Sequence, residues 1–396
     1  MKLLVAAALI ACGTPLPVSS PPPAAMPAPG SDAAPIDAAD AEVAPLDAAP
    51  SPDADLSALG SGSGSADPNA EVWLRGNTHV HAKPSGDSTE PIANVIAWYE
   101  ARHYDFIVLT DHNQVSEIDP ANDTHGQVAV RNPAHGLIVL AGAELTHNPT
   151  GCEPPGDASR KCRIHVNAIG VTARPVGKIS WAHGKTHDRI AKYQLAFDEA
   201  KLLGATLIQI NHPQWFWGMQ PSVLIELVKR GATLMEVGNA QFEKWNVGDK
   251  DHPSTEQLWD AALQAGETLW GTASDDAHYY GKGHGQWPAG GAWIVVHARR
   301  DPQAILDAIA HGHFYASNGV ELVRAGTDGG DLVVEVAPGQ SATTIQWIEN
   351  GTVVDTTTQL TARRAIPATG YLRADVVRDD GKRAWIEPVR SGQGRP

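Results

Sequence analysis

The chain has 396 residues, of which 42% are apolar and 19% charged, and its formal net charge is −15. This length and composition exclude a wholly disordered protein, and the lack of any long apolar run after the N-terminal segment excludes several membrane-spanning helices. Residues 71–396 carry 37 acids against 29 Lys and Arg without a basic stripe, so a long nucleic acid is not an expected partner.

The N-terminus has the features of an export signal. Lys2 precedes an apolar run that is too short to span a bilayer. The run ends in Leu9-Ile10-Ala11-Cys12-Gly13, which resembles the bacterial lipobox. Residues 1–12 would then be a lipoprotein signal peptide with lipidation at Cys12, and Gly13 favours sorting to the outer membrane, facing the periplasm or the cell surface. An ordinary signal peptide with an incidental Cys is the alternative.

A segment of low complexity follows the signal. Residues 13–70 consist mainly of Pro, Ala, Ser, Gly and Asp, with almost no aromatic or β-branched side chains. Such a composition buries too little apolar area to offset the entropy lost on ordering. We expect a disordered tether that holds the rest of the protein away from the membrane.

Short apolar runs alternate with helical patterns from Glu71 onward. Seven strands separated by helix-compatible segments favour an α/β fold with a largely parallel sheet or barrel over residues 71–320. The predicted strands are 72–78, 106–110, 137–143, 163–169, 205–210, 233–237 and 268–272, and the predicted helices are 91–103, 190–203, 221–230 and 254–265. In such folds the ligand site lies at the carboxyl ends of the strands.

Residues 321–396 have the period of strands. Alternating runs are joined by Asn350-Gly351 and Asp380-Gly381, which are strong hairpin signals. We expect a small antiparallel β-sandwich-like domain after the α/β domain. Its sequence carries no cluster of acids and bases, so packing or surface binding is its expected role.

Two cysteines remain after Cys12. Cys152 and Cys162 flank a loop with Gly and Pro, and in an exported chain such a pair suggests a disulfide. Closing this loop would stabilise the fold by roughly 3 kcal/mol in the chain-entropy model. Two free thiols are the alternative.

Histidines and acids accumulate at the ends of the predicted strands. Imidazole and carboxylate groups suit Zn, Mn or Fe, and a carboxylate such as Glu144 can bridge two ions. We therefore predict a site for two or three divalent metal ions. The candidate ligands are His79, His81, Asp87, His112, Glu144, His165, His212, Asp276 and His278.

These residues stand in motifs that resemble the polymerase and histidinol phosphatase (PHP) superfamily. The motifs are Gly76–His81 with Asp87, Tyr104–Asn113, Gly142–Leu145, His165–Gly170, Asn211–Pro213 and Ser274–His278. The resemblance covers about residues 73–320, and the export signal and appended β domain are similar to the secreted carbaryl-hydrolase-like (CehA/McbA-type) branch. The resemblance to the PHP superfamily implies a distorted (β/α)7 barrel.

The resemblance also implies a ligand set for up to three ions. Asp111 would orient a ligand imidazole, and of the adjacent Asp275 and Asp276 the Asp-x-His spacing favours Asp276 as the ligand. The first ion would be held by His79, His81, Glu144 and Asp276, the second by Glu144, His165 and His212, and the third by Asp87, His112 and His278.

The expected reaction class is hydrolysis by a metal-activated water. The first hypothesis is a membrane-tethered phosphoesterase acting on a small phosphorylated compound, with Glu144 and Asp111 in catalytic roles and Arg163 and Lys282 helping to bind the substrate. A carboxylic or carbamate ester hydrolase is the second hypothesis, since Trp215 and Trp217 follow His212. A third is a surface-tethered binding module with a vestigial barrel. The oligomeric state is not predicted.

Overall fold

The computed structural model describes residues 70–118, 130–155, 161–281, 289–340 and 343–392. Ser65–Pro396 form one compact unit. The export signal, Cys12, nearly all of the tether and Lys282 lie outside the described residues, so what is expected of them remains a prediction. Within the described ranges, no helix is long and apolar enough to cross a membrane.

Strands form at all seven predicted positions of the α/β region. They lie side by side in one sheet in chain order, and the pairs β1–β2, β2–β3, β5–β6 and β6–β7 are parallel. The predicted mixed α/β class with a large parallel element is therefore confirmed. The strands are β1 (Val72–Val80), β2 (Phe106–Leu109), β3 (Ile138–His147), β4 (Ile164–Ile169), β5 (Leu207–Ile210), β6 (Leu234–Asn239) and β7 (Trp270–Ser274).

The fourth strand runs against its neighbours. β4 pairs antiparallel with both β3 and β5, and the described part of the β3–β4 connection contains no helix, as a hairpin-like return allows. Thr146 near the end of β3 consequently lies opposite His165 near the start of β4. This reversal brings a histidine at the beginning of a strand to the end of the sheet where the other strands finish.

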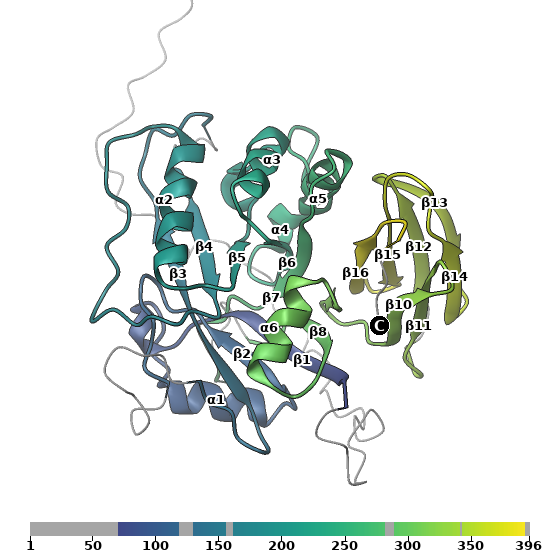
Figure 1. Cartoon of the computed structure of the whole chain (residues 1–396), viewed down its shortest axis with the longest axis horizontal. Coiled ribbons are helices and arrows are strands. Elements are labelled where there is room, and N and C mark those ends of the chain that lie inside the picture. The colour runs from purple at the N-terminus through teal and green to yellow at the C-terminus, as the bar shows by residue number, and fades with distance from the viewer. Residues whose placement is uncertain (1–69, 119–129, 156–160, 282–288, 341–342, 393–396) are drawn as a thin grey trace, which may run out of the picture. The chain divides into compact units, whose positions relative to one another are not determined.

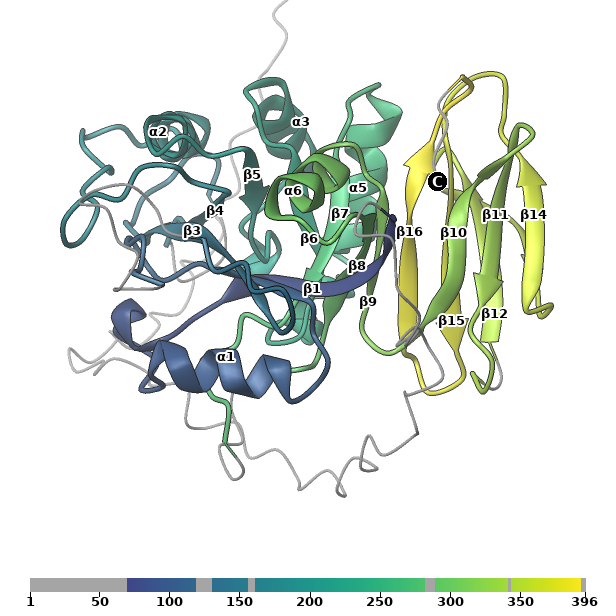
Figure 2. The same cartoon turned by 60° about the horizontal axis from the view of Figure 1, so that its bottom comes forward.

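Helices follow most of the strands, as predicted, and lie around the sheet (Figures 1 and 2). Ser254 caps α5 as expected, because its side chain accepts from the Gln257 N–H and the Gln257 side chain accepts from the Ser254 N–H. The helices are α1 (Ile92–Glu100), α2 (Arg189–Leu202), α3 (Pro221–Lys229), α4 (Glu243–Asn246), α5 (Thr255–Gln264) and α6 (Pro302–Ala310), with 3-10 turns η2 (Lys83–Ser85) and η3 (Trp215–Trp217).

The C-terminal strands are antiparallel, as predicted, and most of them continue the main sheet. β8 and β9, which are not among the predicted strands, lie between β1 and β16, so the sheet runs on through β16, β15, β12 and β13. A second sheet contains β10, β11 and β14. The bounds are β8 (Trp293–Ala298), β9 (Phe314–Ser317), β10 (Leu322–Asp328), β11 (Asp331–Val336), β12 (Thr343–Glu349), β13 (Thr352–Thr357), β14 (Thr361–Ala365), β15 (Leu372–Arg378) and β16 (Arg383–Val389).

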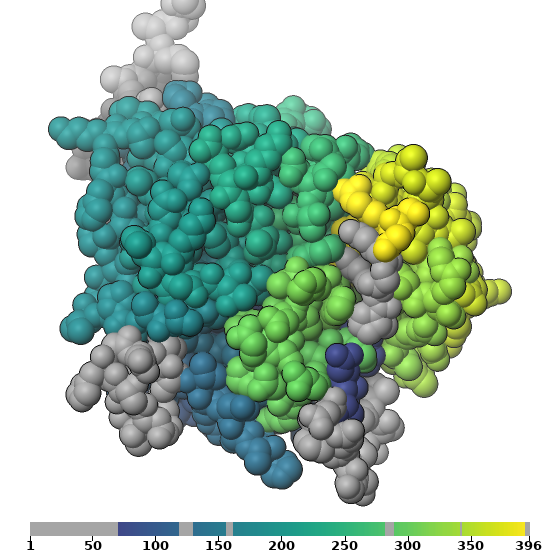
Figure 3. Space-filling model, viewed as in Figure 1, coloured from purple at the N-terminus to yellow at the C-terminus, as the bar shows by residue number. Residues whose placement is uncertain are grey.

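Buried polar contacts fasten these strands to the α/β region. Arg373 of β15 donates from Nε and Nη2 to the two carboxylate oxygens of Asp260 of α5, each at 2.8 Å. Glu387 of β16 accepts from the Gly271 N–H of β7 at 3.0 Å. Figure 3 shows the C-terminal part of the chain, in yellow-green and yellow, in contact with the middle of the chain, in green. The predicted boundary at residue 320 therefore lies within continuous packing.

Candidate metal centre

The nine predicted ligands come together at the end of the sheet where β1, β2, β3, β5 and β7 finish and the antiparallel β4 begins. His79 and Glu144 lie in β1 and β3, and His112, His212 and Asp276 lie two or three residues beyond β2, β5 and β7. Strand ends that meet at one edge of a sheet bring such residues together from distant parts of the chain. The assembled set is His79, His81, Asp87, His112, Glu144, His165, His212, Asp276 and His278.

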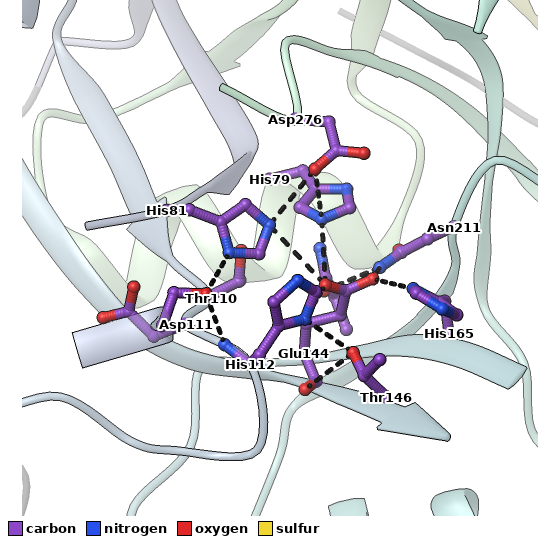
Figure 4. A network of polar contacts seen from close by, with 12 residues as sticks. His79, His81, Thr110, Asp111, His112, Glu144, Thr146, His165, Asn211 and Asp276 are labelled. Carbon is purple, nitrogen blue, oxygen red and sulfur yellow. Dashed lines mark hydrogen bonds and ion pairs between the residues drawn. The ribbon is translucent and has the colours of Figure 1, made fainter. Parts of the chain in front are cut away.

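The first group of ligands is fully buried. His79 Nε2 lies 3.2 Å from Asp276 Oδ1 and 3.5 Å from Glu144 Oε2. His81 Nε2 lies 3.1 Å and 3.5 Å from the same two oxygens. Figure 4 shows both imidazoles pointing at the space between the two carboxylates. Two imidazoles and two carboxylates are a donor set typical of Zn, Mn or Fe sites.

The hydrogen bonds of this group fit a bound cation. His79 Nε2, His81 Nε2 and Glu144 Oε2 are buried, and none of them makes a well-directed hydrogen bond with a described residue, although atoms of Asp276 and His112 lie at ion-pair distance. The other imidazole nitrogens are occupied, since His79 Nδ1 lies 2.8 Å from Glu236 Oε1 and His81 Nδ1 lies 3.0 Å from Ser85 Oγ. An Nδ1–H that donates to such a partner leaves the Nε2 lone pair free for a metal ion.

The second group shares Glu144 with the first. His165 Nδ1 lies 2.8 Å and His212 Nε2 lies 3.6 Å from Glu144 Oε1. Asn211 donates from Nδ2 to the same oxygen at 3.0 Å. Oε1 therefore faces His165 and His212, whereas Oε2 faces His79 and His81, which is the arrangement of a carboxylate that can bridge two ions.

The third group lies nearest the solvent. Asp87 Oδ2 is 2.9 Å from His112 Nε2 and 3.2 Å from His278 Nε2, and ligand atoms of these three residues and His81 lie within 4.8 Å of one another. The Asp87 side chain is 43% exposed, compared with 1% for Glu144. A substrate from solution can therefore reach the third group first.

Charges of opposite sign shift the pKa values throughout the cluster. Burial by itself raises the pKa values of Glu144 and Asp276. The neighbouring imidazoles lower these pKa values by more, so both lie well below the usual range. Burial also works against protonation of His112, yet Glu144 and Asp87 raise its pKa to about 10. Burial lowers the pKa of His81 to about 3 and that of His165 to about 4. In the metal-free protein, the positive charge of the protonated His112 compensates part of the negative charge of Glu144 and Asp87.

Metal affinity at the third group is expected to rise with pH. The His112 imidazole, with its pKa of about 10, is protonated below that pH and must lose its proton to bind a metal ion. One released proton corresponds to about tenfold tighter binding per pH unit between about pH 6 and about pH 8. Competition titrations with a chromophoric chelator at several pH values would measure this slope, and His112→Gln should flatten it. An affinity that does not change with pH would contradict the expectation.

Glu236 is a functional residue that the sequence analysis does not identify. It lies fully buried in β6. Besides contacting His79 Nδ1, its carboxylate accepts from the His212 N–H at 2.6 Å and from Ser274 Oγ at 2.5 Å. One carboxylate thus positions ligands from β1 and from the end of β5. A charged residue inside the apolar run Leu234–Val237 is the sequence signal that could have indicated it.

Glu236→Gln is expected to weaken metal binding and hydrolysis by roughly 10-fold to 100-fold, as the loss of a carboxylate that orients a ligand imidazole does in other metal sites. The amide keeps the shape but no longer holds the Nδ1–H of His79 with a full negative charge. Metal titration and hydrolysis rates would check this, with Glu226→Gln on the exposed face of α3 as the matched control. Unchanged metal affinity would contradict the role of Glu236.

Asp111 and Asp275, which each precede a ligand in the sequence, have partners outside the cluster of ligands. Asp111 accepts from the Ala82 N–H at 2.7 Å and from the Ser116 hydroxyl, and Figure 4 shows its carboxylate pointing away from the imidazoles. Asp111 therefore holds the backbone after His81. The role expected of Asp111, orienting a ligand imidazole, falls to Glu236, which contacts His79 Nδ1. Asp275 accepts from Tyr99 Oη at 2.8 Å, while Asp276 faces the ligands, in agreement with the Asp-x-His spacing.

Arg163 lies near the second group of ligands. Arg163 places its guanidinium over the rings of Trp215 and Phe216, at 4.0 Å and 4.3 Å from their centroids. Cys152 and Cys162 are joined by a disulfide with their Cα atoms 5.4 Å apart, and Arg163 follows this bridge directly. The substrate-binding role of Arg163 remains a prediction.

Lys178 fixes the backbone of the third group. Its Nζ donates to the carbonyls of Pro84, Ser85 and His112 at 2.8, 3.1 and 2.7 Å. The next residue is anchored as well, because the Ile179 N–H donates to the Asn113 carbonyl at 2.7 Å. One ammonium group therefore ties the turn before Asp87 to the chain at His112.

Lys178→Met is expected to lower metal affinity roughly 10-fold to 100-fold at the third group alone. The substitution keeps most of the aliphatic stem but removes the three hydrogen bonds, so Asp87 and His112 lose their fixed separation. At limiting metal the variant should bind one equivalent fewer than the wild type. Lys201→Met, at an exposed position of α2, is the control, and full occupancy in Lys178→Met would argue against the positioning role.

Comparisons with known proteins add little to this geometry. Neither a protein-family profile nor a curated protein matches the sequence. Among solved structures, a chain described as a "putative metal-dependent phosphoesterase" from Bifidobacterium adolescentis aligns with a TM-score of 0.32 and 15% identity, over 53% of this chain and 89% of its own length.

Proposed function

We propose that this protein is a metal-dependent hydrolase, and that its reaction is the hydrolysis of a small phosphate ester. The observation that carries the proposal is the position of Glu144, whose two carboxylate oxygens face separate groups of imidazoles. When bound, two or three Zn, Mn or Fe ions would lower the pKa of a water molecule and polarise the phosphate oxygens.

The residues of the chain contribute position and access. Glu236, Ser85 and Asn211 orient the buried ligands, so the cluster needs little rearrangement when an anionic substrate arrives. Burial of Glu144 and His79 excludes bulk water from the inner side, whereas the exposed Asp87 leaves the outer side open. A site that is closed on one side and open on the other can bind a small ester at its outer edge.

The proposal includes the finer features of the PHP resemblance. The seven strands would form its distorted (β/α)7 barrel, and the parallel bridge between Val80 and Ala277, which joins the ends of β1 and β7, supports this closure.

Cys12 would anchor the protein to the outer membrane through lipid. Cys12→Ser should then move the protein from the membrane fraction to the soluble fraction, and unchanged fractionation would contradict the anchor.

A carboxylic or carbamate ester hydrolase is the second candidate, favoured by one observation. The Trp215 ring lies 5.3 Å from the His165 ring and 5.2 Å from the His212 ring. An aromatic surface at this distance suits an ester with an apolar group as well as a phosphate ester with one.

Metal content and two substrates separate the candidates. Elemental analysis of residues 71–396, with rates on p-nitrophenyl phosphate and p-nitrophenyl acetate before and after chelation, is the test. Two or three equivalents of metal with chelator-sensitive phosphate release would support the phosphoesterase. Bound metal with acetate release alone would support the second candidate, and no metal after reconstitution would contradict both.

A further inference from the structure

Another group of histidines lies at the end of β1 that is far from the metal centre. β8 lies between β1 and β9 in the sheet (Figure 2), and His297 belongs to β8 while His313 directly precedes β9. Glu71, directly before β1, is eight residues from His79, which at about 3.3 Å per residue is roughly 26 Å. This group is therefore separate from the metal centre.

Three imidazoles and a carboxylate line one cavity at this end of the sheet. The cavity has a volume of about 220 Å³. Asp307 of α6 also lines it, but the Asp307 carboxylate already accepts from Gln303 Nε2 at 2.9 Å. Nitrogen and oxygen ligands of these kinds are those that Zn²⁺ takes. The four donors are Glu71, His297, His311 and His313.

The pairing of β8 with β9 places His297 and His313 opposite each other. Val296 pairs with Phe314 in the ladder, and the His297 N–H donates to the His313 carbonyl at 2.8 Å, so these histidines are the next pair outward. Side chains of directly opposite residues lie on one face of a sheet, with Cβ atoms about 4.5–5.5 Å apart. Two imidazoles in this arrangement can reach one ion.

Two of the imidazoles have a nitrogen suited to a metal ion. His297 Nδ1 is buried and makes no hydrogen bond with a described residue, and Glu71 Oε2 lies 3.6 Å from it, too far for a hydrogen bond. His311 Nδ1 lies 2.7 Å from the Asp307 carbonyl. Because a carbonyl only accepts, the proton of His311 is on Nδ1 and the lone pair is on Nε2.

The spacing of the rings resembles that in the metal centre. The ring centroids of His311 and His313 lie 6.0 Å apart. In the metal centre, the His81 and His278 rings lie 4.2 Å apart and the His112 and His165 rings 6.1 Å apart. The His311–His313 distance falls between these two values.

The four donors must still converge before they can bind an ion. Among the described residues, only the three groups of the metal centre have at least three ligand atoms within 4.8 Å of one another. Glu71 and His311 are exposed, and His297 and His313 are half-buried, so their side chains can turn toward an ion at a cost in rotamer entropy. Arg299 also lines the cavity, but it is exposed and can extend into solvent. The affinity is therefore expected to be lower than at the metal centre.

We propose that Glu71, His297, His311 and His313 form a separate metal site that binds one Zn²⁺ ion, and we call it the junction site. Three imidazoles and one carboxylate supply the four donors of a tetrahedral zinc site. Glu71 directly follows residues 13–70 in the chain. A bound ion would thus join the start of the α/β region to β8 and to the turn before β9. The junction site is independent of the proposed hydrolase function.

Zinc titration of the full-length protein tests the junction site by stoichiometry. The metal-free protein is titrated with Zn²⁺ against a chromophoric chelator. The wild type should bind one equivalent more than His297→Gln or His313→Gln, and this additional ion should bind last and be lost when free zinc is removed. Both variants should keep the tightly bound metal and the circular dichroism of the wild type.

Glu71→Gln tests the site without a change inside the fold, because Glu71 is exposed. It should weaken binding of the additional ion roughly tenfold or more, since a neutral amide is a poorer zinc ligand than a carboxylate. His183→Gln is the matched control, because His183 is exposed in the loop before α2, and it should bind zinc like the wild type.

Equal zinc binding by the wild type and the three variants of the junction site would overturn the proposal. An additional ion that is lost equally in His183→Gln would show scattered binding to surface histidines and would also overturn it. Loss of the tightly bound metal in His297→Gln and His313→Gln would show that these histidines act through the metal centre instead. If those two variants do not fold, Glu71→Gln decides, and an unchanged affinity would overturn the junction site.

Discussion

Glu144→Gln is expected to remove most of the bound metal and to lower the rate of hydrolysis by roughly a thousandfold, since a loss of several kcal/mol of electrostatic stabilisation has an effect of that size. Glu144 contacts ligands of all three groups. Its Oε2 lies 2.6 Å from His112 Nδ1 and 3.5 Å from His81 Nε2, and its Oε1 lies 2.8 Å from His165 Nδ1.

The glutamine variant separates charge from shape. Its side chain has the same size, so the buried packing around β3 is preserved, but a neutral amide cannot bridge two cations. Elemental analysis of the variant after metal loading, together with its hydrolysis rate, would check the prediction. Glu226→Gln, on the exposed face of α3, should retain both metal and activity. A Glu144→Gln protein with its full complement of metal would show that Glu144 is not the bridge.

The ligand set could be predicted because it depends on strand order. Residues such as His79, His112 and Asp276 follow apolar runs that read as strands, and parallel strands finish at one edge whatever their exact lengths. His165 is the exception, because it lies inside a predicted strand and not after its end. The antiparallel direction of β4 explains this, since the start of β4 lies at the edge where the parallel strands finish. That direction is decided by the path of the β3–β4 connection, which periodicity does not report.

The supporting residues could not be predicted in the same way. Glu236 and Lys178 act through contacts with β1 and with the chain at Pro84 and His112, and these partners are distant in sequence. An exposed Lys in a loop has no local pattern that distinguishes it, and a Glu inside an apolar run stands out in the sequence but does not reveal which histidine it contacts. The strands β8 and β9 escaped prediction for a related reason, since their pairing with β1 and β16 depends on tertiary packing rather than on local propensity.

Arg373→Met is expected to destabilise the whole described unit by about 3–5 kcal/mol, the usual cost of removing one partner from a buried ion pair. The Arg373 side chain is 2% exposed, and it binds Asp260 of α5 and, at 2.7 Å, Asp375 of β15. Tyr371 donates to the same Asp260 carboxylate at 2.7 Å. Methionine fills much of the volume but leaves two buried carboxylates without their cation.

Urea denaturation followed by circular dichroism would measure this loss. Arg363→Met is the matched control, because Arg363 also lies in the C-terminal strands and contacts Asp331 at 2.7 Å, yet it is 54% exposed; exposed pairs contribute about 0–1 kcal/mol. If Arg373→Met unfolds in one transition at lower urea, α5 and the C-terminal strands form one cooperative unit. Two separate transitions would instead show an independently folding C-terminal domain. If there is a single transition, deletion of residues 321–396 would expose β9 and leave the Asp260 carboxylate without its cation. Loss of activity in such a truncated protein would then report unfolding. Glu144→Gln, in contrast, tests the metal centre with the fold intact.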